Sequence, residues 1–437
     1  MKKLMELFDV TPRVASTLAL IVGILLLSGT IAFFMSAPPK NLRMITGPEG
    51  STFHETGLKY AKALAQHGVK LEILTSTGSL ENLHQLSDPK AKIDLAIVQG
   101  GLFNDEVNLK GVVSLGTVKH QPLFFFYRGK HTDRLSEMRG KRLAIGAEGS
   151  GTRKLALQLL ALNKIKPEAS QGTTLLDLKG KHATQALIAG EIDGLFIMTG
   201  DARLNDLKKL MRAENVKLMS FKNASAYMRR IDALHNLDLP EGVIDFSRNL
   251  PPQTVKLVSV MAEIVAKESL HSAISDLVLD AATAIHRDPG LFQKRGEFPA
   301  PIAHNMKLSE DAQHFFKSGK TLLYRHLPFW LASLTGRFFV VFLPILLLII
   351  PLVRTTPALL RWVGELKIRR RYKTLLKIEQ EIKATTDGAK LDSLYKEFEG
   401  VEQDVRNMRV RPAFAEQFYF LRGHIDYVRK LILRKEV

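Results

Sequence analysis

The chain of 437 residues contains no cysteine and only two tryptophans. Without cysteine the protein has no disulfide, no thiolate nucleophile and no metal site with Cys ligands. Catalytic signatures are missing as well. Residues 146–152 have the glycine spacing of a phosphate loop without its lysine, His54-Glu55 lacks the second histidine of a zinc helix, and no Gly-x-Ser-x-Gly sequence occurs. We therefore predict that the protein is not an enzyme and uses no metal or cofactor.

Long apolar runs are few, and two of them predict membrane spans. Val14–Phe34 contains 21 residues without a charge, enough to cross a bilayer core of about 30 Å. Phe338–Val353 is shorter and reaches full length with the apolar residues before it, which include Trp330. We expect transmembrane helices at 14–35 and 328–353.

A cleaved signal peptide is the alternative for the first run. Cleavage after Ala37 would put the bulky Met35 and Pro38 at positions where processing sites prefer small residues. An uncleaved anchor fits these residues better.

Acidic residues are scarce relative to basic ones, and the formal net charge is +18. Lys2, Lys3 and Arg13 precede the first apolar run, and Arg369-Arg370-Arg371 follow the second. Because positive charge gathers on the cytoplasmic side of spans, segments 1–13 and 354–437 are predicted to be cytoplasmic. Stop-transfer charge and contact with anionic lipid explain the arginine cluster, so we predict no nucleic-acid binding. The segment between the spans carries +10, which suits an anionic ligand.

Between the two runs, strand-like and helix-like patterns alternate in two similar units. The first unit covers 42–98 and the second 142–198. Val112–Tyr127 reads as extended chain passing between two α/β lobes. Thr254–Ile285 reads as a long helical stretch that returns to the first lobe.

Three glycine and hydroxyl turns each follow a predicted strand and open a predicted helix. They are Gly47–Thr52, Thr75–Ser79 and Gly146–Arg153. The start of a helix exposes unpaired N–H groups and the positive end of its dipole. Three such turns could converge on one small anion.

The order of five motifs resembles the TAXI family, the TRAP-associated extracytoplasmic immunogenic solute receptors. The resemblance covers about residues 42–291. The motifs are the turn Gly47–Thr52, Thr77-Gly78-Ser79-Leu80-Glu81-Asn82-Leu83, Asp94-Leu95-Ala96-Ile97-Val98-Gln99, Gly149-Ser150-Gly151-Thr152-Arg153 and Ala186–Phe196. Where this family commonly has Tyr in the opening motif, the chain has Phe53-His54.

The resemblance implies an α/β, type II periplasmic-binding-protein-like fold, with two lobes that close around a solute at a hinge. Two transmembrane helices and a C-terminal helical cytoplasmic region flank that fold here. The implied function is capture of a small organic solute, such as a carboxylate, for a TRAP-type permease. The expected location is the bacterial inner membrane, with the main domain periplasmic. The expected lobes are 40–120 with 222–325, and 121–221.

Each candidate ligand-binding residue has a purely structural alternative. The hydroxyls of the turns also suit helix capping. Arg153 could hold a carboxylate through its planar fork, or lie solvated in the first turn of its helix. The predicted ligand-binding residues are Ser51, Thr52, Phe53, Thr77, Gly78, Ser79, Gln99, Ser150, Gly151, Thr152, Arg153 and Thr199.

The C-terminal region has a helical pattern of its own. Val363–Ala384 and Leu391–Met408 carry apolar residues at helical spacing, Asp387-Gly388 lies between them, and a third helix follows Pro412 to Leu433. These helices would pack together, form a homodimer or dock a cytoplasmic partner. Two further functions stay open: a solute sensor or scaffold that acts through this tail, and an assembly platform that has lost its ligand.

Overall fold

The computed structural model describes residues 12–103, 106–166, 172–178, 180–198, 204–304, 306–319, 327–385, 387–408 and 414–434. The chain divides into two compact units. The α/β unit is Pro38–Thr335, and the helical unit is Met1–Ala37 with Gly336–Val437.

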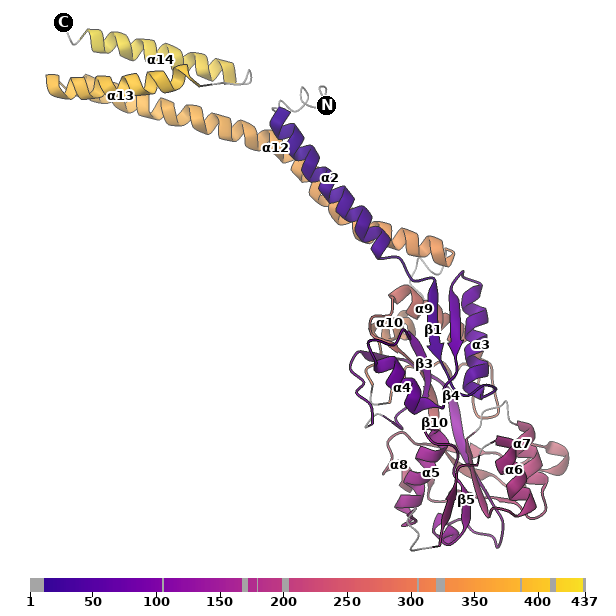
Figure 1. The fold of residues 1–437 in the computed structure, drawn as a ribbon. Helices are drawn as coiled ribbons and strands as arrows, with labels where there is room; N and C mark the ends of the chain where they lie inside the picture. Colours follow the sequence, from indigo (N-terminus) through magenta and orange to yellow (C-terminus); the bar gives the residue numbers. More distant parts are fainter. Residues whose placement is uncertain are drawn as a thin grey trace. The chain divides into compact units, whose positions relative to one another are not determined.

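One ten-stranded sheet runs through the α/β unit (Figure 1). Its order is β2-β1-β3-β10-β4-β7-β5-β6, with β8 beside β4 and β9 beside β10. The strands are β1 (Asn41–Ile45), β2 (Lys70–Leu74), β3 (Leu95–Gln99), β4 (Val112–Tyr127), β5 (Arg142–Ala144), β6 (Thr174–Leu176), β7 (Gly194–Met198), β8 (Lys217–Leu218), β9 (His235–Leu239) and β10 (Val255–Lys267). The strands at the two ends are parallel, β1 with β2 and β3, and β5 with β6 and β7. The two βαβ units predicted from the sequence are therefore present.

Two long antiparallel strands, β4 and β10, connect the lobes. Val112–Leu123 of β4 pairs with β10, and Leu123–Tyr127 continues beside β7. Strand β10 pairs with β3 through residues 262–266 and with β9 through residues 255–259. The extended joint predicted for Val112–Tyr127 is thus one continuous strand.

Helices cover each lobe and bury its apolar side chains. The first lobe carries α3 (Thr52–Ala65), α4 (Ser79–Ser87), α9 (Ser272–His286) and α10 (Glu310–Ser318), and the second carries α5 (Gly151–Leu162), α6 (Gly180–Ala189), α7 (Leu204–Arg212) and α8 (Ala224–Met228). One cluster packs Tyr60 and Leu64 of α3 against Ile274 and Val278 of α9. This packing holds α9 on the first lobe.

The prediction of a helix over Thr254–Ile285 is wrong in its first half. Residues 255–267 form β10, and α9 begins only at Ser272. All of its residues except Lys256 and Lys267 are buried, and sheet neighbours pair with both of its edges. Its β-branched Val and Ile side chains suit a strand buried on both faces.

The lobe boundary also differs from the expected one at 221 and 222. Leu239, Ile244 and Leu257 lie in one core cluster with Leu187 and Leu207 of the second lobe. The chain from Leu239 to the start of β10 therefore packs with the second lobe, and it returns to the first lobe along β10.

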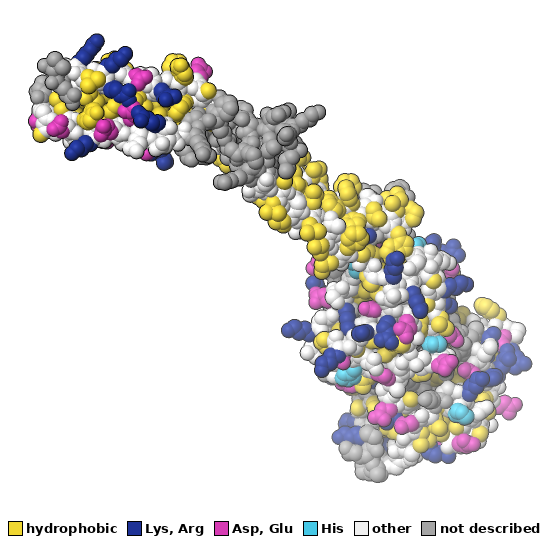
Figure 2. All heavy atoms as spheres, turned by 45° about the horizontal axis from the view of Figure 1, so that its top comes forward, with side chains coloured by type: hydrophobic (Ala, Val, Ile, Leu, Met, Phe, Trp, Pro, Cys, Tyr) yellow, Lys and Arg dark blue, Asp and Glu magenta, His cyan; other side chains and the backbone are white. Residues whose placement is uncertain are grey.

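The helical unit contains the apolar helix α2 (Pro12–Met35) and all but the first residues of α12 (Phe329–Ala384), which is apolar in its first part. The ring centroids of Phe33 in α2 and Phe342 in α12 lie 5.8 Å apart with the ring planes tilted by 53°, and Arg337 donates to the Phe33 carbonyl at 3.1 Å. Figure 2 shows hydrophobic side chains gathered along this helix pair. Among the described residues, Phe329–Leu352 is the one stretch long and apolar enough to cross a membrane, while the apolar part of α2, Ala19–Met35, is shorter.

The C-terminal helices pack into a bundle with their own core. Helix α13 (Gly388–Arg406) begins at the capping residue Asp387, and α14 (Ala415–Leu433) follows it. Leu375 of α12, Phe398 of α13 and Leu421 of α14 are almost fully buried together. Self-packing, one of the arrangements that the sequence left open for the tail, is present among the described residues. However, α12 is continuous from Phe329 to Ala384, so no break separates the apolar segment from the first bundle helix.

Candidate functional site

A cleft of about 790 Å³ lies between the two lobes. In parallel sheets the carboxyl ends of the strands share one edge, and ligands bind in the crevice there. The loops that follow β1, β2 and β5 all reach this cleft, as do the ends of β3 and β7. The three turns singled out in the sequence are therefore brought together at one place.

Two of these turns cap their helices. Ser51 Oγ accepts from the His54 N–H at 3.2 Å at the start of α3. Ser150 Oγ accepts from the Arg153 N–H at 3.3 Å at the start of α5. The capping role foreseen as the alternative is present, and these two hydroxyls also line the cleft.

The middle turn is braced differently. The N–H and the hydroxyl of Thr77 both donate to Glu81 Oε2 at 2.8 Å, and the backbone bond is the main cause that lowers the pKa of this carboxyl. The buried hydroxyl of Ser79 donates to the Gln99 side chain and accepts from the Gln99 N–H at 3.0 Å. Ser79 thereby fixes the end of β3 against the start of α4.

One hydroxyl in the cleft wall remains unused. The Oγ atom of Ser76 is shielded from solvent and has no hydrogen-bond partner. Ser76 lines the cleft beside Thr77. A shielded hydroxyl without a partner is costly, so it is well placed to bond a polar group of a ligand. Ser76 was not among the binding residues predicted from the sequence, although it lies inside the motif Thr75–Ser79.

Ten of the twelve predicted binding residues line the cleft. They are Ser51, Thr52, Phe53, Thr77, Gly78, Ser79, Gln99, Ser150, Gly151 and Thr152. Thr199 lies outside the described residues.

The prediction for Arg153 needs correction. Its side chain is absent from the cleft lining and forms an ion pair with Asp177. The same guanidinium donates to the Gly146 carbonyl at 3.4 Å. A positive charge in the first turn of a helix is unfavourable beside the positive end of the helix dipole, and Asp177 supplies the negative charge that offsets this for Arg153. This arginine braces the turn at Gly146 from outside the cleft.

A fourth turn in the cleft was missed. Leu178 follows β6, α6 begins at Gly180, and Leu178, Lys181 and His182 line the cleft. The signal was present in the sequence, because Gly180 stands between a predicted strand and a predicted helix as in the other turns.

The charged and apolar parts of the lining set its chemistry. Among the residues that the structure describes, the charged side chains of the lining are Glu49, Glu148 and Lys181, all exposed at the cleft. An anionic group would therefore rely on helix starts and hydroxyls more than on a guanidinium. Apolar surface comes from the first lobe through Phe53 and from the second through Leu178 and Met198.

The lobes already touch along one side of the cleft. A Cβ atom added at Gly78 would lie 2.8 Å from the Gly149 carbonyl oxygen, and one at Gly151 would lie 2.5 Å from the Gln99 side chain. Lys154 of α5 pairs with Glu106 of the first lobe. Glycine at positions 78 and 151 permits this approach of the two backbones.

A buried histidine lies beneath the cleft. His286 ends α9 and lines a small cavity that shares Thr52, Phe53 and Gln121 with the cleft. Its ring lies 5.8 Å from that of Tyr60, and neither His286 Nε2 nor the Tyr60 hydroxyl has a partner. Burial lowers the pKa of His286 to about 3, so the ring is neutral at pH 7.

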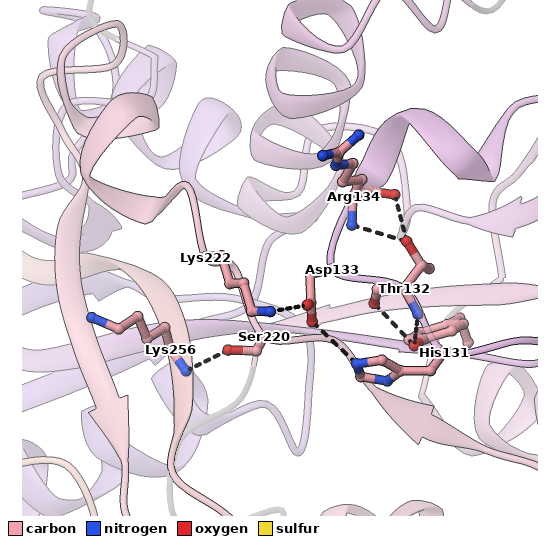
Figure 3. A network of polar contacts seen from close by, with 8 residues as sticks. His131, Thr132, Asp133, Arg134, Ser220, Lys222 and Lys256 are labelled. Carbon is pink, nitrogen blue, oxygen red and sulfur yellow. Dashed lines mark hydrogen bonds and ion pairs between the residues drawn. The ribbon is translucent and has the colours of Figure 1, made fainter.

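A second polar network lies elsewhere in the second lobe (Figure 3). Asp133 pairs with Lys222 at 2.6 Å and lies 3.6 Å from His131. The Thr132 N–H donates to the Tyr127 hydroxyl at 2.9 Å. None of these residues lines the cleft. The network secures the loop after β4. Among the described residues no group of three or more His, Asp or Glu side chains could hold a metal ion.

Comparison with solved structures finds distant likenesses. An ancestral arginine-binding protein bound to arginine shares 15% identity, covering 58% of this chain and 95% of that one at a TM-score of 0.37. The periplasmic aliphatic sulphonate binding protein SsuA from Escherichia coli shares 15%, covering 56% and 69% at 0.33. The methionine binding protein MetQ shares 14%, covering 57% and 92% at 0.32. No curated protein matches the chain by sequence. Residues 44–237, which include all four turns of the cleft, match the NMT1-like family.

Proposed function

We propose that the α/β unit is an extracytoplasmic receptor that binds a small organic solute, anionic in charge, between its two lobes. The observation that carries this proposal is the convergence of four helix starts on one cleft, with the unpaired Ser76 hydroxyl among them. N–H groups at helix starts favour anions. Closure over the solute would then occur across β4 and β10, which are the strands that connect the lobes.

The finer assignments belong to the same proposal. The receptor is of the TAXI type and delivers its solute to a TRAP-type permease. Two membrane spans, α2 and the apolar part of α12, hold it in the bacterial inner membrane with both termini cytoplasmic. The length of Phe329–Leu352 and the basic residues around both apolar helices support this topology.

A second candidate function is a solute sensor. It is favoured by the continuity of α12, whose apolar segment runs without a break into the helix that contributes Ile368, Leu375 and Ile378 to the bundle core. A movement of this helix would reach the bundle directly. Deletion of 387–437 that leaves solute uptake intact and abolishes a cytoplasmic interaction would support this function.

Thermal unfolding of the full chain in detergent tests the receptor proposal. Dicarboxylates, keto acids, amino acids and inorganic anions are added in turn. A ligand that binds only the folded state raises the melting temperature in proportion to the logarithm of its concentration. We expect such a rise with at least one organic anion and its loss in Ser76→Val. No rise with any compound would contradict the receptor proposal.

A further inference from the structure

The size and lining of the cleft narrow the class of solute, on the premise that the proposed receptor function holds. We infer that the solute is an amphipathic organic acid: an acidic head held by the helix starts, and an apolar body larger than that of a four-carbon dicarboxylate. This inference rests on the lining of the cleft, where the polar turns form one part of the wall and apolar side chains from both lobes form another.

The volume of the cleft is large for a very small acid. Pockets for drug-sized ligands measure about 300–1,000 Å³, and the cleft of about 790 Å³ lies in the upper part of that range. The lobes already meet at Gly78 and Gly149, and Lys154 pairs with Glu106. The cleft therefore has this volume even though the two lobes are already in contact along one side. A four-carbon dicarboxylate would leave much of this space to water.

The apolar part of the lining is accessible to a ligand. Leu178, before α6, and Met198, at the end of β7, are both partly exposed at the cleft. Phe53 of α3 lies at the cleft from the first lobe, with its ring largely buried. Apolar surface that stays wet is unfavourable, so covering it with a hydrocarbon or aromatic body stabilises the complex. Methionine also adapts its shape to irregular apolar partners.

The charged side chains in and near the cleft explain why the acidic head group of the solute would bind weakly by itself. Arg153 is engaged with Asp177 outside the cleft, and the exposed Glu49 and Glu148 oppose the charge of an anion. Lys181 is the one cation among the described residues that line the cleft. A solute that bound only through its negative charge would find few positive side chains in the cleft to balance that charge. An apolar body adds affinity that does not depend on charge.

Binding of a graded series of acids to the full chain in detergent tests the inference. The probes are acetate, benzoate, phenylacetate and 3-phenylpropanoate, with succinate as the small dicarboxylate. We expect affinity to rise by about fourfold for each methylene added and buried, and 3-phenylpropanoate to bind more tightly than succinate. In Met198→Gln, the ratio of the 3-phenylpropanoate and succinate affinities should fall severalfold. Met211→Gln on α7, which is outside the cleft lining, is the matched control and should leave this ratio unchanged.

The outcomes separate the two proposals. Tighter binding of succinate than of every aromatic acid would overturn the amphipathic solute and leave the receptor function standing. An equal ratio in Met198→Gln and Met211→Gln would place the apolar body elsewhere and overturn the inference, with Leu178→Gln as the second variant if Met198→Gln unfolds. Binding of none of these acids, with a normal melting transition, would overturn the amphipathic acid, and the wider panel of anions under the proposed function would then decide on the receptor itself.

Discussion

The backbone of Gly78, in the first lobe, lies against the carbonyl oxygen of Gly149, in the second. A Cβ atom at position 78 would approach that oxygen to 2.8 Å. The φ angle of Gly78 is +153°, which side chains rarely adopt. This contact is a backbone approach between lobes that only a residue without a side chain permits.

Substitution of Gly78 by alanine should separate the lobes. The added methyl group collides with a backbone oxygen, which cannot rotate away as a flexible side chain would. The absence of native cysteine allows spin labels at Lys62→Cys on α3 and Lys209→Cys on α7. We expect the label-to-label distance to lengthen in Gly78→Ala. Electron paramagnetic resonance distance measurements check this expectation.

The matched control is Gly149→Ala. Gly149 also has a positive φ, +72°, but a Cβ there would meet only Thr77 Oγ1 at 3.5 Å. It should lower stability by about 1–2 kcal/mol without lengthening the distance between the labels. The same lengthening in both variants would refute steric contact at Gly78 as the cause.

Removal of the Ser79 hydroxyl should destabilise the cleft. Ser79 is 1% exposed, and its Oγ bonds both the backbone and the side chain of Gln99. In Ser79→Ala these buried groups lose a partner, which costs about 1–3 kcal/mol. The free energy of unfolding in denaturant measures the loss. Ser87→Ala, whose hydroxyl only bonds carbonyls of its own helix, should change it by less than about 0.5 kcal/mol.

The alternation of strands and helices could be predicted because each element of the two βαβ units has its own periodicity and a glycine turn beside it. Strand β10 could not be predicted in this way. Val255–Lys267 is a mostly apolar run of 13 residues, long enough for either element, and periodicity alone does not separate a fully buried strand from a buried helix. Its strand character depends on β3, β4 and β9, which pair with it from distant positions in the chain.

In the candidate site, too, one part could be predicted from the sequence and another part could not. The turns could be predicted because a strand, a glycine and a helix start follow one another locally in the sequence. The position of Arg153 depends on Asp177, which lies 24 residues further along the chain and after another strand. No local pattern relates these two side chains, so the ion pair that takes Arg153 out of the cleft could not be foreseen.

The proposed two-span topology can be tested with single cysteines, because the chain has none of its own. Lys90 in the α/β unit and Ser393 in α13 are both exposed. In intact spheroplasts, an impermeant maleimide should label Lys90→Cys and not Ser393→Cys. Permeabilisation should make both reactive. Labelling of Ser393→Cys before permeabilisation would place the tail outside and contradict the proposed topology.

Acid should destabilise the α/β unit through His286. The pKa of this ring falls from its ordinary 6.5 to about 3, chiefly because burial disfavours the charged form, and the nearby Lys119 and Lys59 act in the same direction. Between these two values the unfolded chain binds a proton that the folded protein does not. Stability therefore falls as the pH drops from 6.5 toward 3, at most by about 1.4 kcal/mol per pH unit.

The variant His286→Gln isolates this effect. It has no titrating ring, so the melting temperature of its α/β unit should depend less steeply on pH between 6.5 and 4 than that of the parent protein. Above pH 7 the two curves should run parallel, because the ring is then neutral in both the folded and the unfolded chain. Nuclear magnetic resonance of the ring protons checks the cause directly, since a ring that takes up a proton near pH 6 in the folded protein would exclude burial as the source of the acid sensitivity.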